Sequence, residues 1–168
     1  MKKITMLLLL AVMMVQSLAA KTVKEIINDY REENKAEYTY VSPAMMMMVR
    51  LAASKYSPET GEVLKNVNSV SILRLNACKS KVKKKLIKEM DKPDEAEYQP
   101  MVMNGSAKSS ADKDFKVLVK ADLDAVSEIV VLHASDDDCS LIQVEGKISM
   151  DDIQKLIEGT KSMDKIMK

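Results

Sequence analysis

The sequence predicts an α+β fold: a single domain with a roughly six-stranded, largely antiparallel sheet and helices packed on one face. Two observations predict it. Segments with helical periodicity alternate with strand-like segments over the first part of the chain, and four strand-like runs then follow in close succession. Short connections favour an antiparallel meander, and the apolar face of such a sheet needs helices to cover it.

The first twenty residues have the pattern of a secretory signal peptide. Two lysines precede an apolar run from Ile4 to Val15, and small residues end the segment. This order is typical of a leader that a signal peptidase removes, and we expect cleavage after Ala19 or Ala20. The apolar run is about 12 residues, shorter than the roughly 20 that span a bilayer. We therefore expect a signal peptide over residues 1–20 and one α+β domain over residues 21–168.

The elements after the leader begin with a helix over residues 22–33. A short strand is expected over residues 36–42, where tyrosines alternate with smaller side chains. Ser42 then has the side chain of a helix N-cap, and Pro43 suits the first helical position, where no backbone donor is needed. This second helix is expected to end near Tyr56. The first helix is predicted by apolar residues at helical spacing: Val23, Ile26, Ile27 and Tyr30.

The middle of the chain is expected to contain a loop, a strand and a helix. Residues 57–66 are expected to form a solvent-exposed loop with a turn at Gly61. The apolar, β-branched segment from Asn68 to Cys78 is typical of a central strand. A lysine-rich helix is expected from Lys79 to Lys92, where Pro93 ends it, and its apolar positions share one side: Val82, Leu86, Ile87 and Met90.

The last third of the chain predicts a meander and a closing helix. Ser149 is expected to cap that helix, with Asp152 three residues later in a capping-box position. Turn signals separate the four strand-like runs that precede it: residues 98–106, 114–122, 126–135 and 139–147.

Composition limits the classes of function. Without the leader the chain carries 24 basic and 25 acidic residues, so it has no overall charge that would attract nucleic acid. It has no tryptophan and only one phenylalanine, which disfavours base-stacking and sugar-binding platforms. We expect no nucleic-acid partner, no cofactor and no transmembrane segment after cleavage of the leader.

The two cysteines, Cys78 and Cys139, are disulfide candidates in an exported chain. Their disulfide would close a loop of about 60 residues and stabilise the fold by roughly 4 kcal/mol in the chain-entropy model. The alternative is that both are free thiols that pack as small apolar side chains.

The lysine-rich helix is the weak candidate for a binding surface. Its positive face could contact anionic head groups, although acidic residues follow at once and a solvated outer face is the favoured interpretation. The surface consists of five lysines: Lys81, Lys83, Lys84, Lys85 and Lys88.

The run from Met45 to Met48 has three interpretations. Met45 and Met48 lie one helical turn apart, and soft thioethers suit Cu(I), but no further ligands accompany them. Core packing is favoured, because Met47, Met48 and Leu51 continue an apolar stripe and methionine fills irregular cores. A flexible apolar binding surface is the remaining interpretation.

Catalytic motifs are weak throughout. His133 is the only histidine, which excludes a multi-histidine metal site. It could pair with Cys139 across a tight hairpin as a nucleophile and base, but no nucleophile elbow or phosphate-binding loop accompanies it. Three aspartates, residues 136–138, lack the spacing of a calcium loop and are interpreted as a hydrated turn. We name no catalytic, cofactor-binding or metal-ligating residue.

Several segments of the chain carry a family resemblance. They are the MKK leader, SPAMM (residues 42–46), SVSILRLNAC (69–78) leading into the lysine-rich helix, YQPMVMNGS (98–106), DFKVLVKAD (114–122) and SEIVVLHASDDDCSLIQVEGKIS (127–149). Together they resemble an uncharacterised family of exported Bacteroidetes proteins, domain-of-unknown-function family 4252. The resemblance extends over nearly the whole chain after the leader, and its last segment is the most specific. It implies an envelope location and a small α+β domain, and it supplies no active-site residues.

The leading functional hypothesis is an exported, non-enzymatic cell-envelope protein that binds a protein, a peptide or the membrane surface as an accessory module. Its location would be the periplasm, the outer-membrane face or the medium. The first alternative is a hydrolase whose site forms only on folding. The second is a copper- or redox-handling protein that uses Met45, Met48, Cys78 or Cys139.

Overall fold

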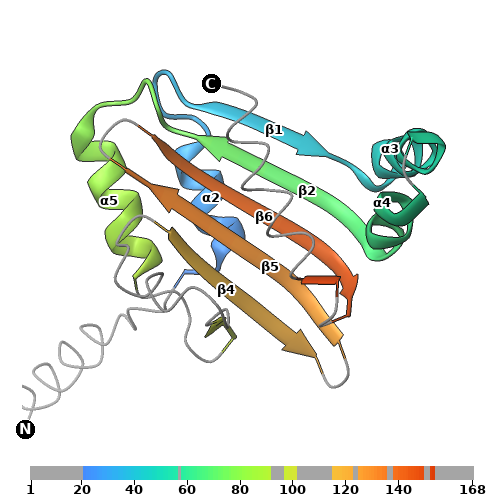
Figure 1. The fold of residues 1–168 in the computed structure, drawn as a ribbon. Coiled ribbons are helices and arrows are strands. Elements are labelled where there is room, and N and C mark those ends of the chain that lie inside the picture. Colours follow the sequence, from blue (N-terminus) through green and yellow to red (C-terminus); the bar gives the residue numbers. More distant parts are fainter. Residues whose placement is uncertain are drawn as a thin grey trace, which may run out of the picture.

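A computed structural model shows one antiparallel sheet with helices on one face and at one end (Figure 1). It confirms the predicted α+β fold class. No helix among the described residues is long and apolar enough to cross a membrane. The structure describes residues 21–56, 58–91, 97–101, 115–122, 125–135, 138–149 and 152–153.

The sheet contains six strands in the order β1-β2-β6-β5-β4-β3. All neighbouring pairs are antiparallel, and β4, β5 and β6 form the predicted meander. The strand β2 lies between β1 and β6, so it joins the first part of the chain to the meander. The strand bounds are β1 Glu37–Val41, β2 Val67–Arg74, β3 Gln99–Pro100, β4 Phe115–Asp122, β5 Ala125–Ala134 and β6 Cys139–Ile148.

Helices α2 (Val23–Tyr30) and α5 (Ser80–Met90) lie behind the same face of the sheet in Figure 1. The α2 helix begins with a capping box. The Glu25 backbone N–H donates to Thr22 Oγ1 at 3.3 Å, and the Thr22 N–H donates to Glu25 Oε2 at 2.9 Å. The predicted apolar stripe of this helix is confirmed, because all four of its residues are buried.

The core under α2 and α5 is built from alternate residues of the central strands. Leu73 faces Leu141 across β2 and β6, and Leu141 faces Leu132 across β6 and β5. These side chains pack in one cluster with Leu86 and Met90 of α5. A second cluster on the opposite sheet face includes Val67, Val117, Ile129, Val144, Ile148 and Ile153.

Helices α3 (Pro43–Tyr56) and α4 (Pro58–Val63) lie together at one end of β1 and β2 (Figure 1). Ser42 caps α3 as predicted, since the Met45 N–H donates to its hydroxyl at 3.4 Å. The predicted loop over residues 57–66 is wrong: α4 and a 3₁₀ turn, η1 (Leu64–Asn66), occupy the described part of it. Gly61 permits close packing, because a Cβ there would collide with Ser54 of α3. Glycine at this position is explained by helix contact rather than by a turn.

Several predicted features are only partly covered by the structure. The strand over residues 98–106 is observed as the two residues of β3, and residues 102–114 lie outside the described part. Ser149 acts as the predicted cap, because the Asp152 N–H donates to its hydroxyl at 3.3 Å. The remainder of the closing helix, Pro93 and the leader over residues 1–20 lie outside the described residues.

Candidate functional site

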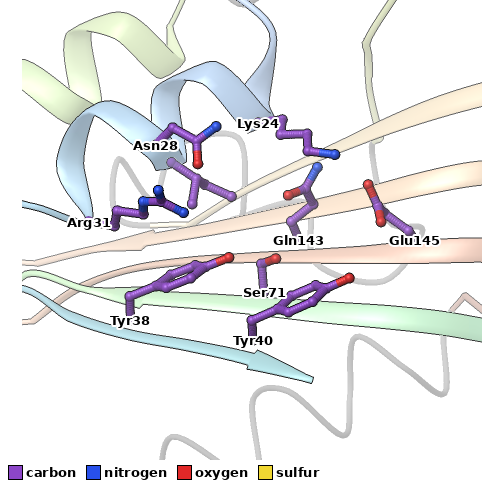
Figure 2. Close-up of a pocket in the computed structure, with 9 residues that line it drawn as sticks. Lys24, Asn28, Arg31, Tyr38, Tyr40, Ser71, Gln143 and Glu145 are labelled. Atoms are coloured by element: carbon purple, nitrogen blue, oxygen red, sulfur yellow. The ribbon is translucent and has the colours of Figure 1, made fainter. Parts of the chain in front are cut away.

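A polar pocket lies between α2 and the sheet, beside the edge strand β1 (Figure 2). Its volume is about 330 Å³, at the small end of the range for ligand pockets. Its side chains come from α2, β1, β2 and β6. They are Lys24, Ile27, Asn28, Arg31, Tyr38, Tyr40, Ser71, Gln143 and Glu145.

The register of β2 and β6 explains the polar floor. Side chains two residues apart point to the same face of a strand, so Ser71 shares its face with Leu73, and Gln143 shares its face with Leu141. Ser71 and Gln143 are direct cross-strand neighbours, and both are largely buried. On the sheet face that packs against the helices, the side chains therefore change from leucine to polar residues over two positions of each strand.

A buried hydrogen-bond network holds Gln143. Its Nε2 donates to Glu128 Oε1 at 2.8 Å, and the Tyr98 hydroxyl donates to the same oxygen at 2.7 Å. Burial raises the pKa of the Glu128 carboxyl, and these two hydrogen bonds oppose the shift. One N–H of the Gln143 amide is thus used by Glu128, which leaves the amide oxygen as an acceptor and the second N–H as a donor.

Glu145 provides the negative charge of the pocket. The hydroxyl of Ser69 donates to Glu145 Oε2 at 2.6 Å, across the β2–β6 pair. This short charge-assisted hydrogen bond orients the carboxylate. Figure 2 shows Glu145 and Gln143 next to each other on the sheet side of the pocket.

The helix side of the pocket carries two cationic side chains and an amide. Lys24, Asn28 and Arg31 follow the spacing i, i+4, i+7, which places them on one stripe of the helix. The guanidinium carbon of Arg31 lies 5.9 Å from the centre of the Tyr38 ring, within cation–π range. Figure 2 shows these three side chains on the opposite side of the pocket from Tyr40.

The second candidate site is the methionine surface, which we define as the exposed large apolar side chains of α3. The prediction of core packing for Met47, Met48 and Leu51 is wrong, because 59%, 66% and 64% of these side chains is exposed. Only Met46 of this helix is buried, since it alone reaches the cluster on the second sheet face. The methionine surface consists of Met45, Met47, Met48, Val49, Leu51 and Tyr56.

The structure separates His133 from Cys139, which could have formed a nucleophile–base pair but to which the sequence assigns no catalytic role. His133 faces Ser140 in the β5–β6 register, whereas Cys139 is the neighbour of Ser140 along β6. Adjacent residues of a strand point to opposite faces, so His133 and Cys139 lie on opposite faces of the sheet. Asp138 Oδ2 lies 3.6 Å from His133 Nδ1. Asp136 and Asp137 lie outside the described residues.

The two cysteines are free thiols in this structure, so of the two alternatives the structure shows unpaired thiols rather than the candidate disulfide. Both belong to the core cluster under α2 and α5. The Cys78 thiol donates to the Asn34 carbonyl oxygen at 3.4 Å. Burial raises the pKa of the Cys139 thiol to about 11.

The lysine surface lies on α5 as predicted. Of its five lysines only Lys83 is partly buried, and the other four are exposed. The ammonium group of Lys85 pairs with Glu89 at 3.8 Å and lies 5.6 Å from the Tyr30 ring centre. These contacts support a solvated outer face.

Metal chemistry finds little support in the described part of the chain. No group of three or more histidine, cysteine or acidic side chains with metal-binding geometry occurs there. The thioethers of Met45 and Met48 are on α3, whereas Cys78 precedes α5, at the other end of the sheet in Figure 1. The methionine thioethers and the Cys78 thiol, which were considered as copper ligands, are therefore not brought together in one site.

One protein-family model matches the sequence of this chain. It is described as a domain of unknown function (DUF4252), and it matches residues 30–156. The chain belongs to this family. Neither a curated protein nor a solved structure matches the chain. The DUF4252 match includes β1, β2, α3 and the meander, and therefore most of the pocket, although Lys24 and Asn28 of α2 precede it.

Sequence reasoning missed the pocket. The sequence does contain a pattern that indicates the pocket. In β2 and β6, four polar residues continue the alternate positions that begin with Leu73 and Leu141: Ser69, Ser71, Gln143 and Glu145. Two polar residues on the same face of each neighbouring strand indicate a local polar site. Finding it also required the pairing of β2 with β6, which lie about 70 residues apart in the chain.

Proposed function

We propose that this DUF4252 member is an exported, non-enzymatic cell-envelope protein that binds a protein partner through the methionine surface of α3. The observation that carries the proposal is the exposure of six large apolar side chains on one helix that buries only Met46. Scattered apolar residues are normal on protein surfaces, but a concentration of them on one element is typical of interaction sites.

The attachment of α3 supports a rigid docking platform. Arg50 Nη1 donates to the Lys65 carbonyl oxygen at 2.8 Å, and its Nε donates to the Met46 carbonyl oxygen at 3.3 Å. Gly61 of α4 adds close packing against Ser54. A surface that is already ordered loses less conformational entropy when a partner binds. Methionine side chains then adapt to an irregular apolar partner surface.

Export is supported by the signal-peptide pattern of residues 1–20. Cell fractionation with amino-terminal sequencing tests it. We expect the mature chain in an envelope or secreted fraction, with Ala20 or Lys21 as its first residue. An intact amino terminus in the cytosol would contradict export.

Partner binding is tested by crosslinking the tagged protein in its native envelope and identifying captured proteins by mass spectrometry. We expect stoichiometric capture of one protein, and loss of that protein with the double variant Met48→Gln/Leu51→Gln. The matched control is Lys55→Gln, an exposed polar change on the same helix. Capture that is equal for both variants would contradict the methionine surface as the docking site. Binding of both wild type and control to lipid vesicles, without a protein partner, would favour a membrane surface instead.

A further inference from the structure

The polar pocket has opposite charges on its two sides. Lys24 and Arg31 are on the α2 side, and Glu145 is on the sheet side (Figure 2). Such an arrangement fits a ligand that carries an anionic group at one end and a cationic group at the other. A ligand with a single charge would leave one side of the pocket without its complement.

The sheet side offers three acceptors close together. They are the Glu145 carboxylate, the Gln143 amide oxygen and the Ser71 hydroxyl. Ser71 and Gln143 are direct cross-strand neighbours, and Glu145 is two residues further along β6 on the same face. A primary ammonium group has three N–H donors and no acceptor. The number and type of these floor groups therefore match an ammonium group.

The floor is oriented before any ligand arrives. Glu128 holds the nitrogen of the Gln143 amide at 2.8 Å, and Ser69 holds one oxygen of Glu145 at 2.6 Å. Gln143 is only 4% exposed, so its polar side chain is a built part of the pocket rather than a mobile surface group. On the α2 side, the Arg31 guanidinium provides N–H donors that a carboxylate can accept.

We propose that this pocket binds a small zwitterion of the amino-acid or dipeptide class. Its ammonium group is held by Glu145, Gln143 and Ser71, and its carboxylate is held by Arg31, which lies at the opposite end of the α2 stripe from Lys24 (Figure 2). Tyr40 of the edge strand lines the same pocket and would add a cation–π contact to the ammonium group. This site is separate from the methionine surface, so it goes beyond the docking function proposed above.

The test uses dialanine as the probe and the full chain as the protein. Binding is measured by calorimetry and by the NMR shift of the Gln143 side-chain amide. We expect saturable binding of dialanine, and at least tenfold weaker binding of both N-acetyl-dialanine, which lacks the ammonium group, and dialanine amide, which lacks the carboxylate. Equal binding of all three, or no binding of dialanine, would overturn the proposal. Preferential binding of an uncharged methyl glycoside would overturn it in favour of a sugar site.

Two variants locate the site. We expect Glu145→Gln to weaken dialanine binding at least tenfold and to abolish the preference over N-acetyl-dialanine. Arg31→Gln is expected to reduce the preference over dialanine amide. Glu62→Gln and Lys55→Gln are matched controls on α4 and α3, and they should bind as the wild type does. Thermal unfolding of each variant confirms that it is folded. Unchanged binding in a folded Glu145→Gln variant would contradict the assigned ammonium site.

Discussion

The side-chain amide of Gln143 donates a hydrogen bond of 2.8 Å to the buried carboxylate of Glu128. This contact links the floor of the pocket to the interior of the sheet. Gln143 lines the pocket, whereas Glu128 lies beside it on the neighbouring strand β5, where Tyr98 donates to the same oxygen. The orientation of a pocket residue thus depends on a carboxyl group that is not part of the pocket lining.

Glu128 should make stability depend on pH in a recognisable way. Burial is the largest cause of the raised pKa of the Glu128 carboxyl. The protonated carboxyl therefore favours the folded state. This contribution to the free energy of unfolding is full below the pKa that Glu128 has in the unfolded chain, and it is lost as pH rises through its pKa in the folded protein. We expect Glu128→Gln to remove this loss, so that its thermal midpoint exceeds that of the wild type by more at pH 7 than at pH 4. Thermal unfolding across this range measures the difference. Parallel curves for the two proteins would contradict the assignment, and Glu62→Gln serves as the exposed control.

Gly146 should tolerate no larger side chain. A Cβ at this position would collide with the backbone carbonyl oxygen of Asn66, which cannot move without shifting the start of β2. We expect Gly146→Ala to lower the free energy of unfolding by about 1–3 kcal/mol. Urea denaturation measures it. The neighbouring exposed change Lys147→Ala should cost less than about 0.5 kcal/mol, and an equal loss in both variants would refute the steric explanation.

Two leucines distinguish the core from the methionine surface. Leu73 is fully buried, whereas Leu51 is 64% exposed. We expect Leu73→Ala to lower the free energy of unfolding by about 2–5 kcal/mol, because it leaves a cavity under α2 and α5. Leu51→Ala should change it by less than about 0.5 kcal/mol. Chemical denaturation of both variants provides the comparison. A large loss for Leu51→Ala would mean that this side chain is covered in the folded protein.

The cysteines should be unreactive in the folded protein. Burial raises the pKa of Cys139 to about 11 and also raises that of Cys78, so the reactive thiolate is scarce at neutral pH. We expect no labelling by a thiol reagent in the native state, and labelling of two thiols per chain in guanidinium chloride. If unreduced protein in guanidinium chloride exposes no reactive thiol, the prediction is wrong and the two cysteines form the candidate disulfide.

Elements with local signals were predicted well. The buried stripe of α2, the cap at Ser42 and the meander of β4 to β6 depend on periodicity and turn residues within a few positions. The fate of α3 was not predictable in this way. Its apolar residues surround the helix, so the pattern does not indicate which side is buried, and only packing against η1 and β2 selects Met46. The pocket likewise depends on pairing between distant strands.

The position of β2 in the sheet has a consequence for how the chain acquires its structure. Arg74 pairs with Ser140 and Val70 pairs with Val144, so one side of β2 stays without its neighbour until β6 has been synthesised. The β1–β2 pair alone is a two-stranded ribbon, which is marginally stable in water. We therefore expect the amino-terminal half to remain unfolded during synthesis and to fold only when the carboxyl-terminal meander supplies the partner strand β6. Because these contacts join distant parts of the chain, we expect folding to be slow.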